Sequence, residues 1–163
     1  MTGSSRIVIL IASAVCYALA FPPLGLVPLA LAGVGGLIWS LAEVTPRGAF
    51  ARGLLWGLLV FGTGLSWLWN IFHAFCVPLW LLLALFPALF AWLVARARMR
   101  GLHGLSLAVY TALAWCGTEF IRCELMPLRF PWMNLGLALE PWPLVSLIGV
   151  YGLGLVAMLA VAG

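Results

Sequence analysis

The chain has 163 residues, of which 66% are hydrophobic and 7% are charged, and its mean hydropathy is +1.20. A soluble domain covers its surface with roughly a quarter charged residues, so this composition excludes a soluble globular protein and favours an integral membrane protein. The net charge of +4 comes from arginines that lie between apolar segments. They therefore indicate membrane topology rather than a nucleic-acid-binding face, and we expect no nucleic-acid partner.

Six apolar segments predict an all-α, polytopic transmembrane bundle that occupies the whole chain, residues 1–163, as one domain. The first segment, at about 15 residues, is short for a bilayer crossing, so a tilted or partly interfacial helix stays open. A cleaved signal peptide is a further alternative, which the apolar segments that follow disfavour. Pro87 predicts a kink in the fourth segment, and the pair Gly53/Gly57 is typical of a close helix contact. The predicted spans are residues 7–21, 26–41, 53–72, 77–95, 105–121 and 144–161.

The arginines predict the orientation of this bundle. With a cytoplasmic N-terminus, six of them fall inside: Arg6, Arg47, Arg52, Arg96, Arg98 and Arg100. Only Arg122 and Arg129 then fall outside, together with Glu119, Glu124 and Glu140. The opposite orientation would invert this bias, so the positive-inside rule favours a cytoplasmic N-terminus.

Polar side chains recur along the third predicted span. Thr63, Ser66, Asn70 and His73 would fall within roughly 80° of arc on one helix. For Thr63 and Ser66 we favour hydrogen bonds between helices. Asn70 and His73 lie closer to the outer surface, where a substrate groove is an equal alternative.

The sequence offers no metal site and no pattern that requires a cofactor. His103, the second histidine, is predicted on the opposite side from His73, and the cysteines show neither CxxC nor a His/Cys spacing. Cys76 and Cys123 both fall at the predicted outer face. A disulfide between them stays open as the less favoured alternative to free thiols.

The stretch 115–136 holds the residues with the strongest functional signal. Glu119 and Arg122 stand at i, i+3, so they can pair on one helix face. An ion pair that anchors the helix end is the favoured interpretation, and a contact of Arg122 or Arg129 with a lipid phosphate is the alternative. Phe130 and Trp132 flank a proline at the depth where aromatic belts form, so they predict either interfacial anchoring or a groove for acyl chains.

These motifs together resemble the N-terminal membrane half of bacterial apolipoprotein N-acyltransferases. The matching segments run in order along most of the chain, and the block from Glu119 to the FPW turn is the most specific. They are 20–23 (AFPP), 62–67 (GTGLSW), 73–75 (HAF), 118–122 (TEFIR), 130–136 (FPWMNLG) and 149–152 (GVYG). Cys76 and Val77 stand where the family usually has glycines, and Trp69, Asn70 and Ile71 also depart from its pattern.

The resemblance implies an enzyme that moves a fatty acyl group from a phospholipid to the N-terminal diacylglyceryl cysteine of a lipoprotein. It also implies that a periplasmic nitrilase-like domain performs the chemistry with a Glu-Lys-Cys triad. This chain contains no lysine, so we expect no catalytic residue in it, no activity of the chain alone, and a catalytic domain that is separate or missing. The ending at Gly163 suggests a fragment.

We therefore expect a multi-pass protein of the bacterial inner membrane whose functional rim faces the periplasm or exterior. The residues expected to contact lipid or substrate are Phe130, Trp132, Arg122, Arg129, Glu119, Asn70 and His73. Phe130 and Trp132 match aromatics that the family places at the lipid entrance. A small transporter or channel, and a non-catalytic scaffold for a separate hydrolase-like domain, remain the alternatives.

Overall fold

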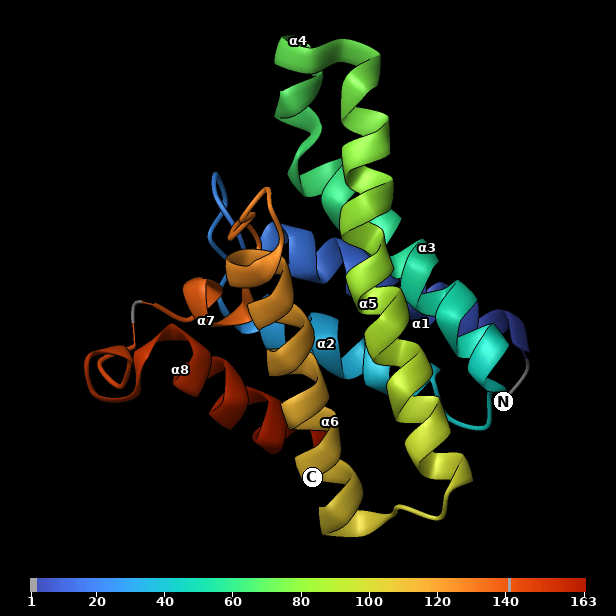
Figure 1. Cartoon of the computed structure of the whole chain (residues 1–163). Helices are drawn as coiled ribbons and strands as arrows, with labels where there is room; N and C mark the ends of the chain where they lie inside the picture. Colours follow the sequence, from blue (N-terminus) through green and yellow to red (C-terminus); the bar gives the residue numbers. More distant parts are fainter. Residues whose placement is uncertain (1–2, 141) are drawn as a thin grey trace.

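The computed structural model describes residues 3–140 and 142–163, and every regular element in this part of the chain is helical. The prediction of an all-α fold is confirmed. Short 3₁₀ elements (η1, η2) and a π-helical turn (η3) connect the longer helices (Figure 1). The elements are α1 (Gly3–Leu19), α2 (Pro28–Ser40), α3 (Pro46–Gly64), η1 (Ser66–Leu68), α4 (Trp69–Phe72), η2 (His73–Phe75), α5 (Cys76–Met99), α6 (Gly104–Phe120), η3 (Ile121–Leu125), α7 (Leu135–Ala138) and α8 (Val145–Ala162).

Three helical stretches are long and apolar enough to cross a membrane: Ser66–Met99, Gly104–Leu125 and Val145–Ala162. The third is interrupted at Gly149, whose φ of 70° and ψ of 175° are not helical. α1 and α2 are shorter apolar helices. The chain is thus a helical membrane protein, while the count of six spans and the cytoplasmic N-terminus remain predictions.

The third predicted span, residues 53–72, is wrong at both ends. α3 begins earlier because Thr45 caps it, accepting a hydrogen bond from the Gly48 amide at 3.2 Å, and Pro46 occupies the first turn, where its missing N–H costs nothing. The helix ends at Gly64, since Leu65 leaves the helical conformation (φ −110°, ψ 20°). The chain then passes through η1, α4 and η2 as a hairpin that projects beyond the other elements (Figure 1).

Glycines allow two pairs of helices to approach closely. On α3, a Cβ at Gly53 would meet the Pro87 carbonyl and lie 2.7 Å from Ala88 Cα, and one at Gly57 would lie 2.8 Å from Ala84 Cα, both on α5. The contact predicted from the Gly53/Gly57 pair is confirmed, and Pro87 lies inside an otherwise continuous helix. Gly33 on α2 faces Tyr17 of α1 in the same way.

The helices enclose a cluster of aromatic side chains. Tyr17, Trp56 and Trp115, from α1, α3 and α6, are all buried, and their rings lie 5.0–6.2 Å apart. Phe90 of α5 extends the cluster, with its ring 5.0 Å from that of Trp115. Each of these large side chains removes much apolar area from solvent and fixes four helices against one another. α1 is therefore part of the core.

Two arginines cover the C-terminal end of α2. Arg52 donates to the Ser40 carbonyl, and Arg6 donates to the Ala42 carbonyl. Cations are favourable at the negative end of a helix dipole, and here they also satisfy carbonyls that have no partner within the helix. Arg6 forms an ion pair with Glu43 at 2.6 Å as well.

Candidate functional site

A π-helical turn ends α6 and leads into the loop that carries the FPW sequence. Met126 N–H donates to the Ile121 carbonyl at 2.8 Å, which closes the wider turn of η3. Arg129 (φ 39°) and Met133 (φ 60°) both adopt left-handed conformations, which are uncommon outside glycine. Such backbone strain persists only where the surrounding structure holds it, so other parts of the protein must hold this loop.

Arg122 supplies the central contact of the loop. Its Nη1 donates to the Phe130 carbonyl at 2.8 Å and to the Trp132 carbonyl at 2.7 Å. Its guanidinium carbon lies 5.5 Å from the centre of the Phe61 ring, and the residue is only 2% exposed. A charge this deeply buried is tolerated because protein atoms surround and pair it.

Glu119 completes the arrangement from the preceding turn of α6. Its Oε1 lies 3.8 Å from Arg122 Nη2 and accepts the Leu135 amide at 2.8 Å. The predicted pair of Glu119 and Arg122 is confirmed, and both partners are buried. One carboxylate and one guanidinium thus hold both ends of residues 130–135.

Two further residues anchor the loop. Tyr17 donates its hydroxyl to the Met133 carbonyl at 3.1 Å, which ties the loop to α1. Asn134 caps α7 by accepting hydrogen bonds from the amides of Gly136 at 2.9 Å and Leu137 at 3.4 Å. Neither residue is among the predicted site residues. A buried tyrosine hydroxyl in an apolar segment normally requires a partner. The position of Tyr17 in such a segment is therefore the sequence feature that indicates a hydrogen bond from its hydroxyl.

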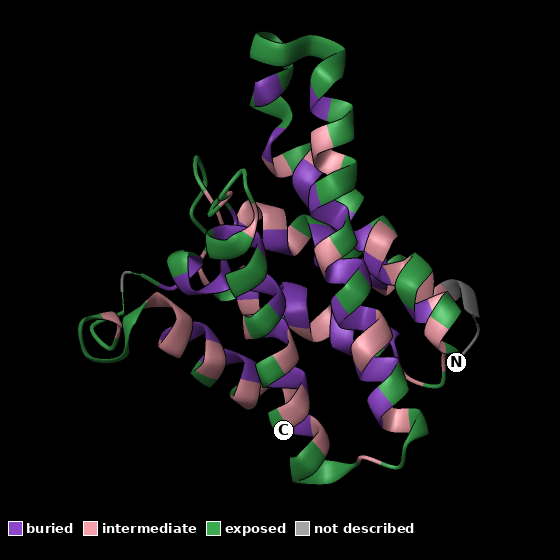
Figure 2. Cartoon of the chain, viewed as in Figure 1, coloured by how far each residue is buried: buried purple, intermediate pink, exposed green. Residues whose placement is uncertain are grey.

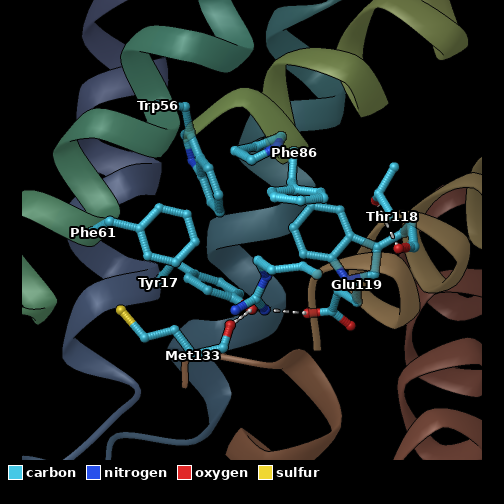
Figure 3. Close-up of a pocket in the computed structure, with 10 residues that line it drawn as sticks. Tyr17, Trp56, Phe61, Phe86, Thr118, Glu119 and Met133 are labelled. Carbon is cyan, nitrogen blue, oxygen red and sulfur yellow. Dashed lines mark hydrogen bonds and ion pairs between the residues drawn. The ribbon is translucent and has the colours of Figure 1, made fainter. Parts of the chain in front are cut away.

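A narrow cavity lies between the aromatic cluster and this ion pair. Tyr17, Trp56, Phe61, Phe86, Thr118, Glu119 and Met133 point toward it (Figure 3). It offers about 20 Å³ to the centres of water-sized molecules, which is space for a water. An acyl chain does not fit in this cavity, so a lipid could contact this part of the protein only at its outer surface.

The exposed aromatic side chains of this region form such a surface. Trp132 is 56% exposed, and its ring meets the edge of Trp67 at 5.9 Å. The hairpin to which Trp67 belongs is exposed over most of its length (Figure 2). We define the aromatic rim as the exposed side chains Trp67, Trp69, Phe72, Phe75 and Trp132.

Comparison with known proteins places the chain in a family. Residues 13–163 match the sequence profile of the apolipoprotein N-acyltransferase N-terminal domain. The chain belongs to the apolipoprotein N-acyltransferase family.

Several relatives named apolipoprotein N-acyltransferase align with nearly the whole chain. The protein of Geobacter metallireducens is 33% identical, over 91% of this chain and 30% of its own length. The protein of Nitrosomonas europaea is 32% identical, over 99% of this chain and 35% of its own length. The protein of Vibrio parahaemolyticus is 34% identical, over 86% of this chain and 30% of its own length. The chain therefore spans about a third of the length of these relatives.

The structure brings together four of the predicted site residues of this family member. Glu119 and Arg122 hold the loop, and Phe130 and Trp132 belong to it. Arg129 lies exposed on the same loop. The contacts of Arg122 favour the anchoring interpretation, and of the two arginines in this stretch only Arg129 is exposed.

Asn70 and His73 lie on the hairpin rather than at this loop, and both are exposed. The predicted polar stripe on one helix is wrong, because α3 ends before Ser66 and His73 adopts a φ of 49°. Thr63 donates to the Leu59 carbonyl of its own helix at 2.6 Å. The stripe therefore forms no continuous polar face.

The cysteines are free thiols. Cys76 lies near the His73 carbonyl, whereas Cys123 lies near the Phe130 carbonyl and Asn134. The disulfide alternative between Cys76 and Cys123 is not formed. Among residues 3–140 and 142–163, no group of three His, Cys or Glu side chains is arranged to hold a metal ion.

Proposed function

We propose that this chain is the membrane part of an apolipoprotein N-acyltransferase and that the aromatic rim seats the acyl chains of a phospholipid donor. The observation that carries the proposal is the pairing of Trp132 with Trp67 beside a loop pinned by Arg122. Aromatic side chains at the interface contact acyl chains and headgroups at once. A rigid backbone behind Trp132 would hold the lipid in one place at little entropic cost.

The chemistry is assigned to another part of the enzyme. The name of the relatives implies transfer of an acyl group to an amine of an apolipoprotein. The triad implied by the family resemblance needs a lysine, and this chain has none. We assign no catalytic role to its cysteines or glutamates.

The orientation and location follow from the same proposal. The aromatic rim faces the periplasm of a bacterial inner membrane, and the clustered arginines face the cytoplasm. The lipoprotein N-terminus would then reach the rim from outside, where Arg129, Asn70 and His73 are exposed. A transporter would have used the polar stripe from Thr63 to His73 as its pathway. That alternative loses its support, because α3 ends at Gly64 and the stripe does not lie on one helix.

A chimera tests the proposal. Residues 13–163 replace the matching segment of the Vibrio parahaemolyticus relative, and acyl transfer from phospholipid vesicles to a diacylated lipopeptide is measured. We expect Trp132→Ala to lower turnover several-fold and to raise the apparent KM for phospholipid. Trp39→Ala is the control, because Trp39 is a similarly exposed tryptophan of α2 outside the rim. Equal rates for both variants would reduce Trp132 to an interfacial anchor and contradict the proposal.

The chain by itself gives a second test. Purified and reconstituted in vesicles, it should transfer no acyl group to the lipopeptide. Transfer above the level of protein-free vesicles would place catalytic residues within these 163 residues and contradict the assignment.

A further inference from the structure

The opposite end of α5 carries a second group of residues that suits a lipid. α5 spans 24 residues, or about 36 Å at the rise of an α-helix, which exceeds a hydrocarbon core of about 30 Å. Its last turns therefore reach the headgroup region at the face away from the hairpin. Arg96 and Arg98 lie in the last turn, and Arg100 follows directly after the helix.

Two of these arginines share one hollow. Arg96 and Arg100 are four residues apart, so they project from the same face of the helix. Both line a cavity of about 130 Å³, with Trp92 on α5 and Tyr110 on α6. Leu102, from the turn between the helices with positive φ at Gly101 (86°) and Gly104 (53°), also lines this cavity. Arg98 lies elsewhere, in a hollow beside Glu43.

The charges in this hollow have no anionic partner within the described part of the chain. Within the described residues, ion pairs join Arg6 to Glu43 and Arg122 to Glu119, so neither includes Arg96 or Arg100. No glutamate lines the cavity. Over the same residues, no hydrogen bond from the Arg96 or Arg100 side chain is formed. Arg96 is positioned instead by Trp92, with its guanidinium carbon 5.5 Å from the ring centre.

We infer that this hollow binds the phosphate of an anionic phospholipid headgroup. Two guanidinium groups match the geometry of phosphate oxygens, and the Tyr110 hydroxyl can add a donor. The apolar lining residues Leu93, Ala97 and Leu102 suit the glycerol and upper acyl carbons. A lipid without a compensating ammonium fits best, because nothing in the cavity offsets the two positive charges. This site is distinct from the aromatic rim and does not depend on the function proposed there.

Arginines at a helix end also satisfy the positive-inside rule and the helix dipole, so the test must separate a built site from diffuse charge. Phosphatidylglycerol is titrated into the detergent-solubilised chain, and bound lipid is counted by native mass spectrometry. We expect the variant Arg96→Gln/Arg100→Gln to weaken the tightest binding about tenfold or more. Arg47→Gln is the control, because Arg47 is an exposed arginine of the same predicted side and does not line the hollow that Arg96 and Arg100 share.

A built site and diffuse charge lead to different outcomes. The site is supported if Arg47→Gln retains phosphatidylglycerol and the double variant loses it. The helical circular dichroism of both variants should be unchanged. The variant Arg96→Lys/Arg100→Lys should bind phosphatidylglycerol less tightly than Arg47→Gln and more tightly than the double glutamine variant, since lysine keeps the charge and loses the planar fork. Arg47→Gln removes one charge and the double variant removes two. If Arg47→Gln lost half or more of the binding free energy that the double variant loses, the attraction would be diffuse, and the proposed site would be overturned. Equal binding of phosphatidylcholine, or displacement of the lipid by millimolar inorganic phosphate, would overturn the assignment to an anionic lipid.

Discussion

Arg122 and Trp132 are joined by a hydrogen bond of 2.7 Å from the guanidinium Nη1 of one to the backbone carbonyl of the other. The two side chains have opposite environments, because that of Arg122 is buried and that of Trp132 is exposed. A buried charge therefore fixes the backbone of an exposed aromatic residue. Substitutions at Arg122 should act on the surface through the loop rather than by direct contact with lipid.

Arg122→Lys should loosen the loop while it keeps the positive charge. Lysine has no planar fork, so it cannot maintain both carbonyl contacts together with the pairing to Glu119. We expect a loss of about 1.5–3 kcal/mol in the free energy of unfolding, measured by denaturation in mixed micelles, and faster proteolysis within residues 126–134. Arg129→Leu is the control, since an exposed side chain should change stability by about 0.5 kcal/mol or less. Identical behaviour of the two variants would refute the anchoring role.

Glu119 performs two tasks, which two substitutions can separate. Glu119→Ala removes both the partner of Arg122 and the acceptor of the Leu135 amide, and we expect a loss of about 3–5 kcal/mol because a buried charge is left unpaired. Glu119→Gln keeps an oxygen for the Leu135 amide and should cost roughly half as much. The same unfolding measurement compares them, and equal losses would show that the amide contact contributes nothing.

Some of this site could be read from the sequence. The spacing of Glu119 and Arg122 predicts their pairing because i, i+3 neighbours share a helix face. The Gly53/Gly57 pair predicts a close helix contact, and the structure identifies α5 as the partner. Both depend on local periodicity within one helix. The all-α class follows equally directly from composition.

Other features depend on tertiary contacts that have no local signal. The helix break after Gly64 has no proline to mark it. Gly64 lies against the side chain of Met133 from a distant loop, since a Cβ added to this glycine would stand 2.6 Å from the Met133 sulfur. His73 and Met133 likewise have positive φ values (49° and 60°), which are uncommon outside glycine. The polar stripe failed for this reason, since its spacing presupposed an unbroken helix.

The ion pair of Arg6 and Glu43 predicts a pH dependence. The hydrogen bond from Arg6, and then its charge, hold the pKa of Glu43 below the ordinary value of 4.5. A lowered folded-state pKa means that the stabilisation is present above the unfolded pKa and is lost as the pH falls through the folded one. We expect the wild-type chain to lose more stability than Glu43→Gln between pH 6 and about pH 3. Parallel pH profiles of the two proteins, followed by thermal unfolding, would contradict this contribution.

Gly53→Ala tests whether α3 and α5 pack as closely as the structure indicates. The added methyl group would meet the Pro87 carbonyl and stand 2.7 Å from Ala88 Cα, both backbone atoms that cannot move aside without shifting α5. We expect a loss of about 1–3 kcal/mol in the free energy of unfolding in mixed micelles. Gly62→Ala on the same helix is the matched control, because nothing lies within 4 Å of its added Cβ, and it should be neutral or slightly stabilising. A Gly53→Ala protein as stable as Gly62→Ala would mean that the two helices stand further apart in the membrane.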